Sequence, residues 1–466
     1  MTNPTPDPAA PPASEERAEE RAPRARAAAR RTASAARTTG RTTTLAARRT
    51  VRTTGRVALT PARALAEMVR YWYAERRTLR QGMVSLSISA VGNIPTGLAL
   101  GAMADRLEAL PGLFILIPAA IGMRGAIFGA LGSRLGTAIQ TGLFRFTRDR
   151  EGLLAQNVYA ATLQTFTTSL FLAVAARAVT AATGLAGMSV WDFLAISVLG
   201  GLLSSVFVLV VTVGLAAAGS RRGWDMDSVA APLITFVGDL ITLPALYAAS
   251  SLAGRGATSL LVGLASAAIC LPAAVAIFRG GASLAKQITR ESMLTLALAG
   301  VVNLIAGAVI EHRSARFLAF PALLVMLPAF LENAGALGGI VSSRLASKLH
   351  LGAIRPRAIP DRLAALDITL AGPWALLNFA LTGITAHIVA VALGLASPGA
   401  PFMAGIALLA GAMATAGAAL VAYVTAVATF RFDLDPDNHG IAAVTSTMDL
   451  IGVICIVASL AILGVI

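Results

Sequence analysis

Beyond residue 80, the chain alternates long apolar stretches with short polar segments. The apolar stretches run for about twenty residues or more, the length that a helix needs to cross the hydrocarbon layer of a membrane. The pattern therefore predicts eleven transmembrane helices. Their expected positions are residues 83–103, 111–132, 157–182, 191–217, 229–252, 256–278, 293–311, 317–341, 366–395, 401–427 and 440–465.

Residues inside and between these stretches recur at a spacing of 210 positions. Two aspartates within apolar stretches, Asp239 and Asp449, are one such pair. With no insertion, the same offset matches Asn93 with Asn303, Gly97 with Gly307, Pro118 with Pro328, Thr235 with Thr445, and Ser133-Arg134-Leu135 with Ser343-Arg344-Leu345. One register held over so many pairs indicates an internal duplication.

Each copy contains five predicted spans, and an odd number of spans would invert the second copy relative to the first. The span at 256–278 has no counterpart in the repeat, and it returns the chain to the side from which it started. Both copies then enter the membrane in the same direction, so we expect a pseudo-two-fold axis along the membrane normal. The predicted fold class is an all-α integral membrane protein with two parallel five-helix repeats and one linking transmembrane helix.

This organisation predicts four segments. Residues 1–80 are rich in Arg, Ala, Pro and Thr with few large apolar side chains, and we expect them to form a disordered cytoplasmic tail. The first transport repeat is expected at 81–252, the linking helix and its loop at 253–290, and the second repeat at 291–466.

Composition and charge agree with a membrane protein. The chain is 56% hydrophobic and 13% charged, with a formal net charge of +14. The predicted tail holds 17 Arg against 7 Asp and Glu, so it either contacts anionic lipid headgroups or serves as a solvated topogenic segment.

Fifteen Lys and Arg in the loops of one side against five on the other predict a cytoplasmic N-terminus and an external C-terminus. Two cysteines and four scattered histidines give no zinc spacing.

Asp239 and Asp449 are the strongest candidates for chemistry. Both are expected near the membrane midplane, where a charged carboxylate costs about 2.5–3.5 kcal/mol on insertion scales. Two carboxylates at the same repeat position, facing each other across the axis, suit a hard divalent cation that prefers oxygen ligands. The alternative is that a protonated or hydrogen-bonded aspartate ties two helices together.

Other oxygen-bearing residues are candidate helpers at this site. Thr235 and Thr445 lie one helical turn before the aspartates, and the amides of Asn93 and Asn303 could turn toward an ion or toward another helix. Acidic loops precede the aspartate spans and include Asp227 and Asp437, which either concentrate cations at the cytoplasmic mouth or form solvated loops. The predicted metal-site set is Asp239, Asp449, Asn93, Asn303, Thr235, Thr445, Asp227 and Asp437.

The second span of each repeat combines a proline, several glycines and the Ser-Arg-Leu sequence, as in residues 116–142 and 327–352. Together with Gly238-Asp239-Leu240, these segments resemble the membrane domain of MgtE-type magnesium transporters, and especially the duplicated form, solute carrier family 41. The resemblance implies a cation path between the two units, with Asp239 and Asp449 as the metal-binding pair. This chain has Ala126 and Ala336 where that family usually has asparagine. We expect no regulatory cytoplasmic domain of the MgtE kind.

The prediction is therefore a transporter of divalent metal cations, Mg²⁺ first, that works in the cell membrane as a monomeric pseudodimer. We expect no enzymatic activity, no cofactor and no nucleic-acid partner; the metal is the transported substrate. One alternative is an intramembrane aspartyl protease, which also uses two membrane aspartates but needs them in unlike helix contexts. A carrier for another solute and a membrane scaffold are the others.

Overall fold

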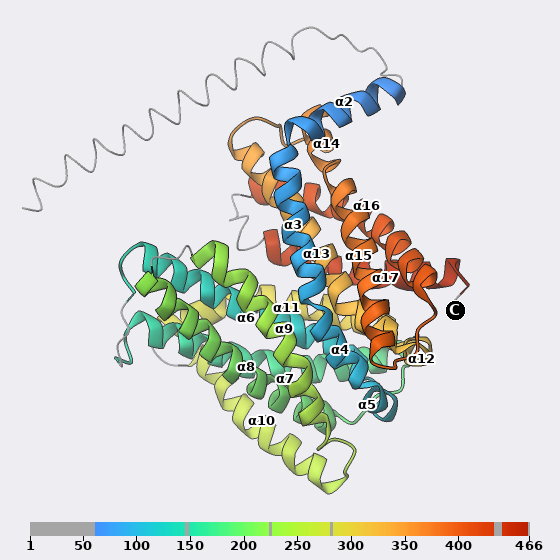
Figure 1. Ribbon diagram of the computed structural model, residues 1–466. Coiled ribbons are helices and arrows are strands. Elements are labelled where there is room, and N and C mark those ends of the chain that lie inside the picture. The colour runs from blue at the N-terminus through green and yellow to red at the C-terminus, as the bar shows by residue number, and fades with distance from the viewer. Residues whose placement is uncertain (1–60, 145–148, 223–225, 280–282, 433–439, 465–466) are drawn as a thin grey trace, which may run out of the picture. The chain divides into compact units, whose positions relative to one another are not determined.

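The computed structural model describes residues 61–144, 149–222, 226–279, 283–432 and 440–464, and within these ranges it is helical with no β-strand (Figure 1). The first repeat and its linking helix comprise α2 (Pro61–Ala74), α3 (Arg76–Gly92), α4 (Ile94–Ala102), α5 (Ala104–Ala109), α6 (Leu113–Gln140), α7 (Leu153–Thr183), α8 (Val190–Arg222), α9 (Met226–Ser250) and α10 (Ala257–Phe278). The second repeat comprises α11 (Leu284–Glu311), α12 (Ser314–Ala319), α13 (Pro321–His350), α14 (Arg362–Ile368), α15 (Ala371–Ala392), α16 (Ala400–Arg431) and α17 (Ile441–Ile462).

Eleven segments of the described chain are long and apolar enough to cross a membrane. Five belong to each repeat, and α10 is the extra span between them. Two spans consist of two helices each, since α3 and α4 form the first and α14 and α15 the ninth. The predicted fold class, with its eleven spans and its duplication, is confirmed.

The first span of each repeat packs against the other repeat. Helices α3 and α4 contact α13 and α15, while α11 contacts α6 and α7. Two glycines permit this approach: a Cβ atom on Gly97 would lie 1.9 Å from the carbonyl oxygen of Val325, and one on Gly307 would lie 2.5 Å from that of Ile115. Because the two contacts are related by the 210-residue offset, they show the pseudo-two-fold relation directly.

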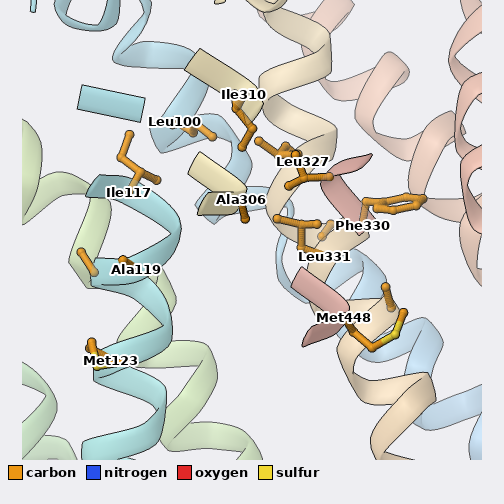
Figure 2. Close-up of a cluster of buried hydrophobic side chains, with 14 of the residues drawn as sticks. Leu100, Ile117, Ala119, Met123, Ala306, Ile310, Leu327, Phe330, Leu331 and Met448 are labelled. Carbon is orange, nitrogen blue, oxygen red and sulfur yellow. The ribbon is translucent and has the colours of Figure 1, made fainter. Parts of the chain in front are cut away.

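Within each repeat, the second span is the central helix. Helix α6 packs against α7, α8 and α9, and α13 packs in the same way against α15, α16 and α17. Figure 2 shows part of the resulting core, to which α4, α6, α11, α13 and α17 all contribute apolar side chains. Helices in lipid associate mainly through close packing. Because these five helices come from both repeats, their shared core holds the two repeats together.

The two copies differ at the middle of the first span. In the first copy, α3 ends at Gly92 and α4 begins at Ile94, with Asn93 at the junction. Pro95 follows, and it has no N–H to donate to the preceding turn. The second copy has Ile305 at the matching position, and α11 runs through Asn303 without a break.

The linking helix α10 packs on α7 and α8, at the first repeat (Figure 1). Asp192, in the first turn of α8, fixes the start of α10 there. Its carboxylate accepts hydrogen bonds from the Gly254 amide at 2.8 Å and from the hydroxyl of Ser259. The matching residue of the second repeat is Phe402, so this attachment exists in the first repeat alone.

The predicted disordered tail was extended too far. Residues 61–80 are helical in α2 and the start of α3, while residues 1–60 lie outside the described chain. Contacts distant in sequence stabilise the helical part: the Trp72 indole donates to the Thr369 hydroxyl at 3.0 Å, and the Trp374 indole donates to the Leu79 carbonyl at 2.9 Å. Composition alone did not reveal these partners.

We predict that Gly97→Ala and Gly307→Ala lower the stability of the protein by at least about 1–3 kcal/mol, because each new methyl group would overlap backbone of the opposite repeat. Gly129→Ala is the matched control, since a Cβ there meets no atom within 4 Å. The measurement is the thermal unfolding midpoint of purified protein in detergent. Equal midpoints for Gly97→Ala and Gly129→Ala would contradict the proposed role of the glycine contact.

Candidate metal site

Three carboxylates, from the last span of each repeat and from the second span of the second repeat, lie close enough to interact electrostatically. Asp239 of α9 interacts with Glu332 of α13 and with Asp449 of α17, and Asp449 also interacts with Glu332. Asp239 is 6% exposed, whereas Asp449 and Glu332 are partly exposed. The two predicted aspartates are therefore within electrostatic range of each other, together with a third acid, Glu332, that has no counterpart at the 210-residue offset.

The spacing of these acids limits how they could hold a metal. Among the described residues, no three His, Cys, Asp or Glu side chains are close enough to coordinate one ion together. Within the described chain, direct coordination of one ion by all three acids is therefore not seen.

Glu332 is not marked by the repeat, which pairs like residues at an offset of 210 positions. The matching position of the first copy is Gly122, so the glutamate has no partner at the 210-residue offset. The available signal was a glutamate inside a membrane-length apolar stretch, which by itself indicates a functional position.

The two threonines occupy equivalent places in the repeats. The Thr235 methyl group lies 3.8 Å from the position of a Cβ on Gly125, and the Thr445 methyl group lies 3.7 Å from that on Gly335. Each methyl group thus faces a glycine of the central helix, one turn before the aspartate. These contacts set the distance between α9 and α6 and between α17 and α13, while a role in binding an ion stays a prediction.

The two asparagines are both buried but have different surroundings. The Asn93 amide nitrogen donates to the Ser89 carbonyl at 3.2 Å, and its oxygen has no partner among the described residues. Asn303 is 1% exposed, and neither atom of its amide has a partner within the described chain. Its amide nitrogen lies 2.3 Å from the position of a Cβ on Gly122, so the amide rests directly against α6.

The acidic loops cannot be placed at the site. Asp437 lies outside the described residues, and the side chain of Asp227, at the start of α9, is also outside them. Their proposed role at a cytoplasmic mouth stays a prediction.

A line of small residues leads from the carboxylates along α6 and α13. These two helices are the most enclosed of the membrane-length spans in the described chain, with 67% and 72% of their most apolar stretch buried. Partial exposure nevertheless recurs along one face of each, at Gly122, Ala126 and Gly129 and at the matching Glu332, Ala336 and Gly339. A Cβ on Gly129 or Gly339 would meet no atom within 4 Å, so this face borders open space in both repeats.

Polar clusters at the far end of the same helices hold the second and third spans together. The Arg134 guanidinium donates to the Asn157 side-chain oxygen at 2.8 Å, and the matching Arg344 donates to Asp367 at 2.6 Å. The second repeat also has Lys348, whose amine lies 3.0 Å from Asp367. The Tyr71 hydroxyl donates to Asp367 at 3.0 Å, and burial together with this carboxylate raises the pKa of Tyr71.

Arg124 is a buried cation that belongs to the first repeat. Its guanidinium donates to the hydroxyls of Ser204 at 3.1 Å and Ser169 at 3.3 Å, which ties α6 to α8 and α7. The matching residue of the second repeat is Ala334. No carboxylate among the described residues forms an ion pair with Arg124, so we assign it to the packing of the first repeat.

The fold is that of a duplicated helical membrane protein, and three acids, Asp239, Glu332 and Asp449, lie inside its membrane-length helices. The family model described as "MgtE: Divalent cation transporter" matches residues 117–249 and 327–459, two segments that are themselves offset by 210 residues. They cover more than half of the chain, which therefore belongs to the MgtE family of divalent cation transporters. The family is one of transporters and not of enzymes, so the aspartyl protease alternative is excluded.

Individual proteins show the same relationship. Solute carrier family 41 member 3 of Rattus norvegicus is 23% identical over 403 residues, covering 80% of this chain and 85% of its own. Solute carrier family 41 member 2 of Homo sapiens is 26% identical over 169 residues, covering 35% of this chain and 29% of its own. The crystal structure of the eukaryotic MATE transporter AtDTX14 aligns with 84% of this chain and 95% of its own at 14% identity, but its TM-score of 0.22 supports no argument.

We predict that Asp367→Asn destabilises the protein by about 1–3 kcal/mol, because Arg344 and Lys348 would lose their buried counter-charge. Those two side chains are 21% and 22% exposed, and water would moderate the loss. The control is Asp361→Asn, which keeps an oxygen to cap α14 at Ala364. Thermal unfolding of both variants gives the comparison, and a smaller loss for Asp367→Asn than for Asp361→Asn would argue against the cluster as an anchor.

Proposed function

We propose that this protein transports Mg²⁺ and that a largely hydrated ion binds between Asp239 and Asp449 on its way through the membrane. The observation that carries the proposal is the equivalent placement of these two aspartates, one helical turn after threonines that pack in the same way on α6 and α13, within reach of each other's charge. Two negative charges match one divalent cation. In the membrane interior, such a cation offsets the free energy of holding like charges together.

Hydration of the ion follows from the spacing of the acids. Direct coordination by three acidic side chains is not available among the described residues. An ion that keeps its first shell of water can still be held by carboxylates and amides through that water. Ala126 and Ala336 supply no side-chain oxygen, and we include the amide of Asn303 as a neutral group of the site because both of its polar atoms are buried without a partner among the described residues.

The proposed path leads from the carboxylates along the small residues of α6 and α13. Gly129 and Gly339 border open space in both repeats, which supports a passage on this face. The helices then reach Arg134 and Arg344, at the ends that the charge distribution places in the cytoplasm. The proposed orientation in the cell membrane has a cytoplasmic N-terminus and an external C-terminus.

A single chain supplies both aspartates, and this supports a functional monomer that has the symmetry of a dimer. The repeats exchange their first spans, so each half depends on the other for its packing. A second copy of the chain is not needed to complete the proposed site.

The main test is uptake of Mg²⁺ into proteoliposomes, with Mn²⁺, Co²⁺ and Ca²⁺ compared as alternative substrates. Asp239→Asn and Asp449→Asn are expected to reduce uptake at least about tenfold, because each removes half of the charge that balances a divalent ion. Asp361→Asn, outside the proposed path, is expected to transport like wild type. Wild-type rates in both membrane-aspartate variants would refute the proposed site.

A second test addresses hydration. Hexaamminecobalt(III) resembles a hydrated magnesium ion but does not release its ligands, so a site for a hydrated ion should bind it. We expect it to inhibit Mg²⁺ uptake competitively, and to inhibit Asp449→Asn less strongly than wild type. Potassium chloride at matched ionic strength is the control. Absence of inhibition would indicate that the ion sheds its water to bind.

A further inference from the structure

The two repeats present different groups at one position beside the aspartates. Position 332 of α13 is a glutamate, and its counterpart on α6 is Gly122. Helix α13 packs against α17 on both sides of this position: a Cβ on Gly335 would lie 3.7 Å from the Thr445 methyl group, and one on Gly452 would lie 2.8 Å from the Leu331 side chain. Glu332 therefore lies level with Asp449, and its charge also acts on Asp239, although it comes from one repeat only.

In the first repeat, an amide fills the corresponding place. Positions 122 and 332 are related by the repeat. A Cβ on Gly122 would therefore point away from α6 in the direction that corresponds to the Glu332 side chain on α13. The amide nitrogen of Asn303, from α11, lies 2.3 Å from that Cβ position. Asn303, which belongs to the second repeat, thus lies against α6 of the first repeat at the place that corresponds to the start of the Glu332 side chain on α13.

Asn303 itself indicates a ligand at this place. It is 1% exposed, and both polar atoms of its amide lack a partner among the described residues. A buried amide without hydrogen bonds is unfavourable in proteins, so such groups normally face water or an ion. This observation is independent of the charges of the three acids.

We propose that Glu332 is the central carboxylate of the cation site, and that Asn303 is its uncharged counterpart, so that the hydrated divalent ion sits closer to the second repeat than to the first. This inference rests on the proposed function. The pseudo-symmetric pair Asp239 and Asp449 provides two charges, and Glu332 adds a third. The site therefore attracts a divalent cation more strongly than a symmetric pair would, and it favours divalent over monovalent ions.

The test compares Glu332→Gln and Glu332→Ala with Glu332→Asp, which keeps the charge. We expect both uncharged variants to weaken ion binding by about tenfold to a hundredfold, as loss of a group around a metal commonly does. Glu332→Asp should stay within about threefold of wild type. Asn303→Ala should have a smaller effect than Glu332→Gln, because it removes no charge.

Two readouts are measured: the KM for Mg²⁺ uptake into proteoliposomes, and the Kd for Mn²⁺ from the electron paramagnetic resonance signal of free Mn²⁺ with purified protein. Glu311→Gln is the matched control, since Glu311 lies at the end of α11 and accepts a hydrogen bond from the Gly112 amide at 2.9 Å, which glutamine can also accept. It should leave both values unchanged.

The outcomes separate this inference from the proposed function. Wild-type Mn²⁺ affinity in either folded uncharged variant, together with weakened binding in Asp239→Asn and Asp449→Asn, would overturn the role of Glu332 and leave the proposed function intact. Wild-type affinity in the two aspartate variants would overturn the proposed function itself. Loss of affinity in Glu332→Gln with retention in Glu332→Asp would support the inference.

Discussion

The backbone contact between the first span of each repeat and the second span of the other holds the two halves of the protein together. It depends on Gly97 and Gly307, since any side chain there would overlap the opposite helix. Lipid tails are as apolar as the helix surfaces, so close packing of this kind is a principal source of attraction between helices in a membrane. With the first spans exchanged, α6 and α13 become the enclosed helices of the bundle, and α9 and α17 pack against them with Asp239 and Asp449.

The enclosed polar groups fall into two kinds according to their partners. Asp367 and Asp192 are surrounded by donors, and Arg124 is held by two hydroxyls, so these residues fasten one helix to another. Asp239, Asp449 and Glu332 instead lie within range of one another's like charge, and Asn303 next to α6 has no partner within the described chain. The first kind stabilises the fold, whereas the second is where a cation would supply the missing interaction.

The two repeats share their backbone contacts more closely than their polar side chains. The glycine contacts and the packing of Thr235 and Thr445 are the same in both repeats. By contrast, the partner of the conserved arginine is Asn157 in one copy and Asp367 in the other, and Gly122 corresponds to Glu332. Packing constrains both copies equally, because each completes the other. The polar residues are constrained only by their own surroundings, so a symmetric frame can hold an asymmetric site.

The sequence by itself determined the eleven spans, the duplication, the extra span at α10 and the candidacy of Asp239 and Asp449. Bilayer thickness sets the length of an apolar stretch, and a duplication leaves a constant offset, so both can be read along the chain. Only the tertiary structure decided that the first spans are exchanged, that Glu332 comes within electrostatic range of the aspartates and that residues 61–80 are helical. These features depend on contacts between distant residues, such as Tyr71 and Asp367, which are 296 positions apart. Hydropathy describes how each segment meets the membrane, and it does not specify which segments meet each other.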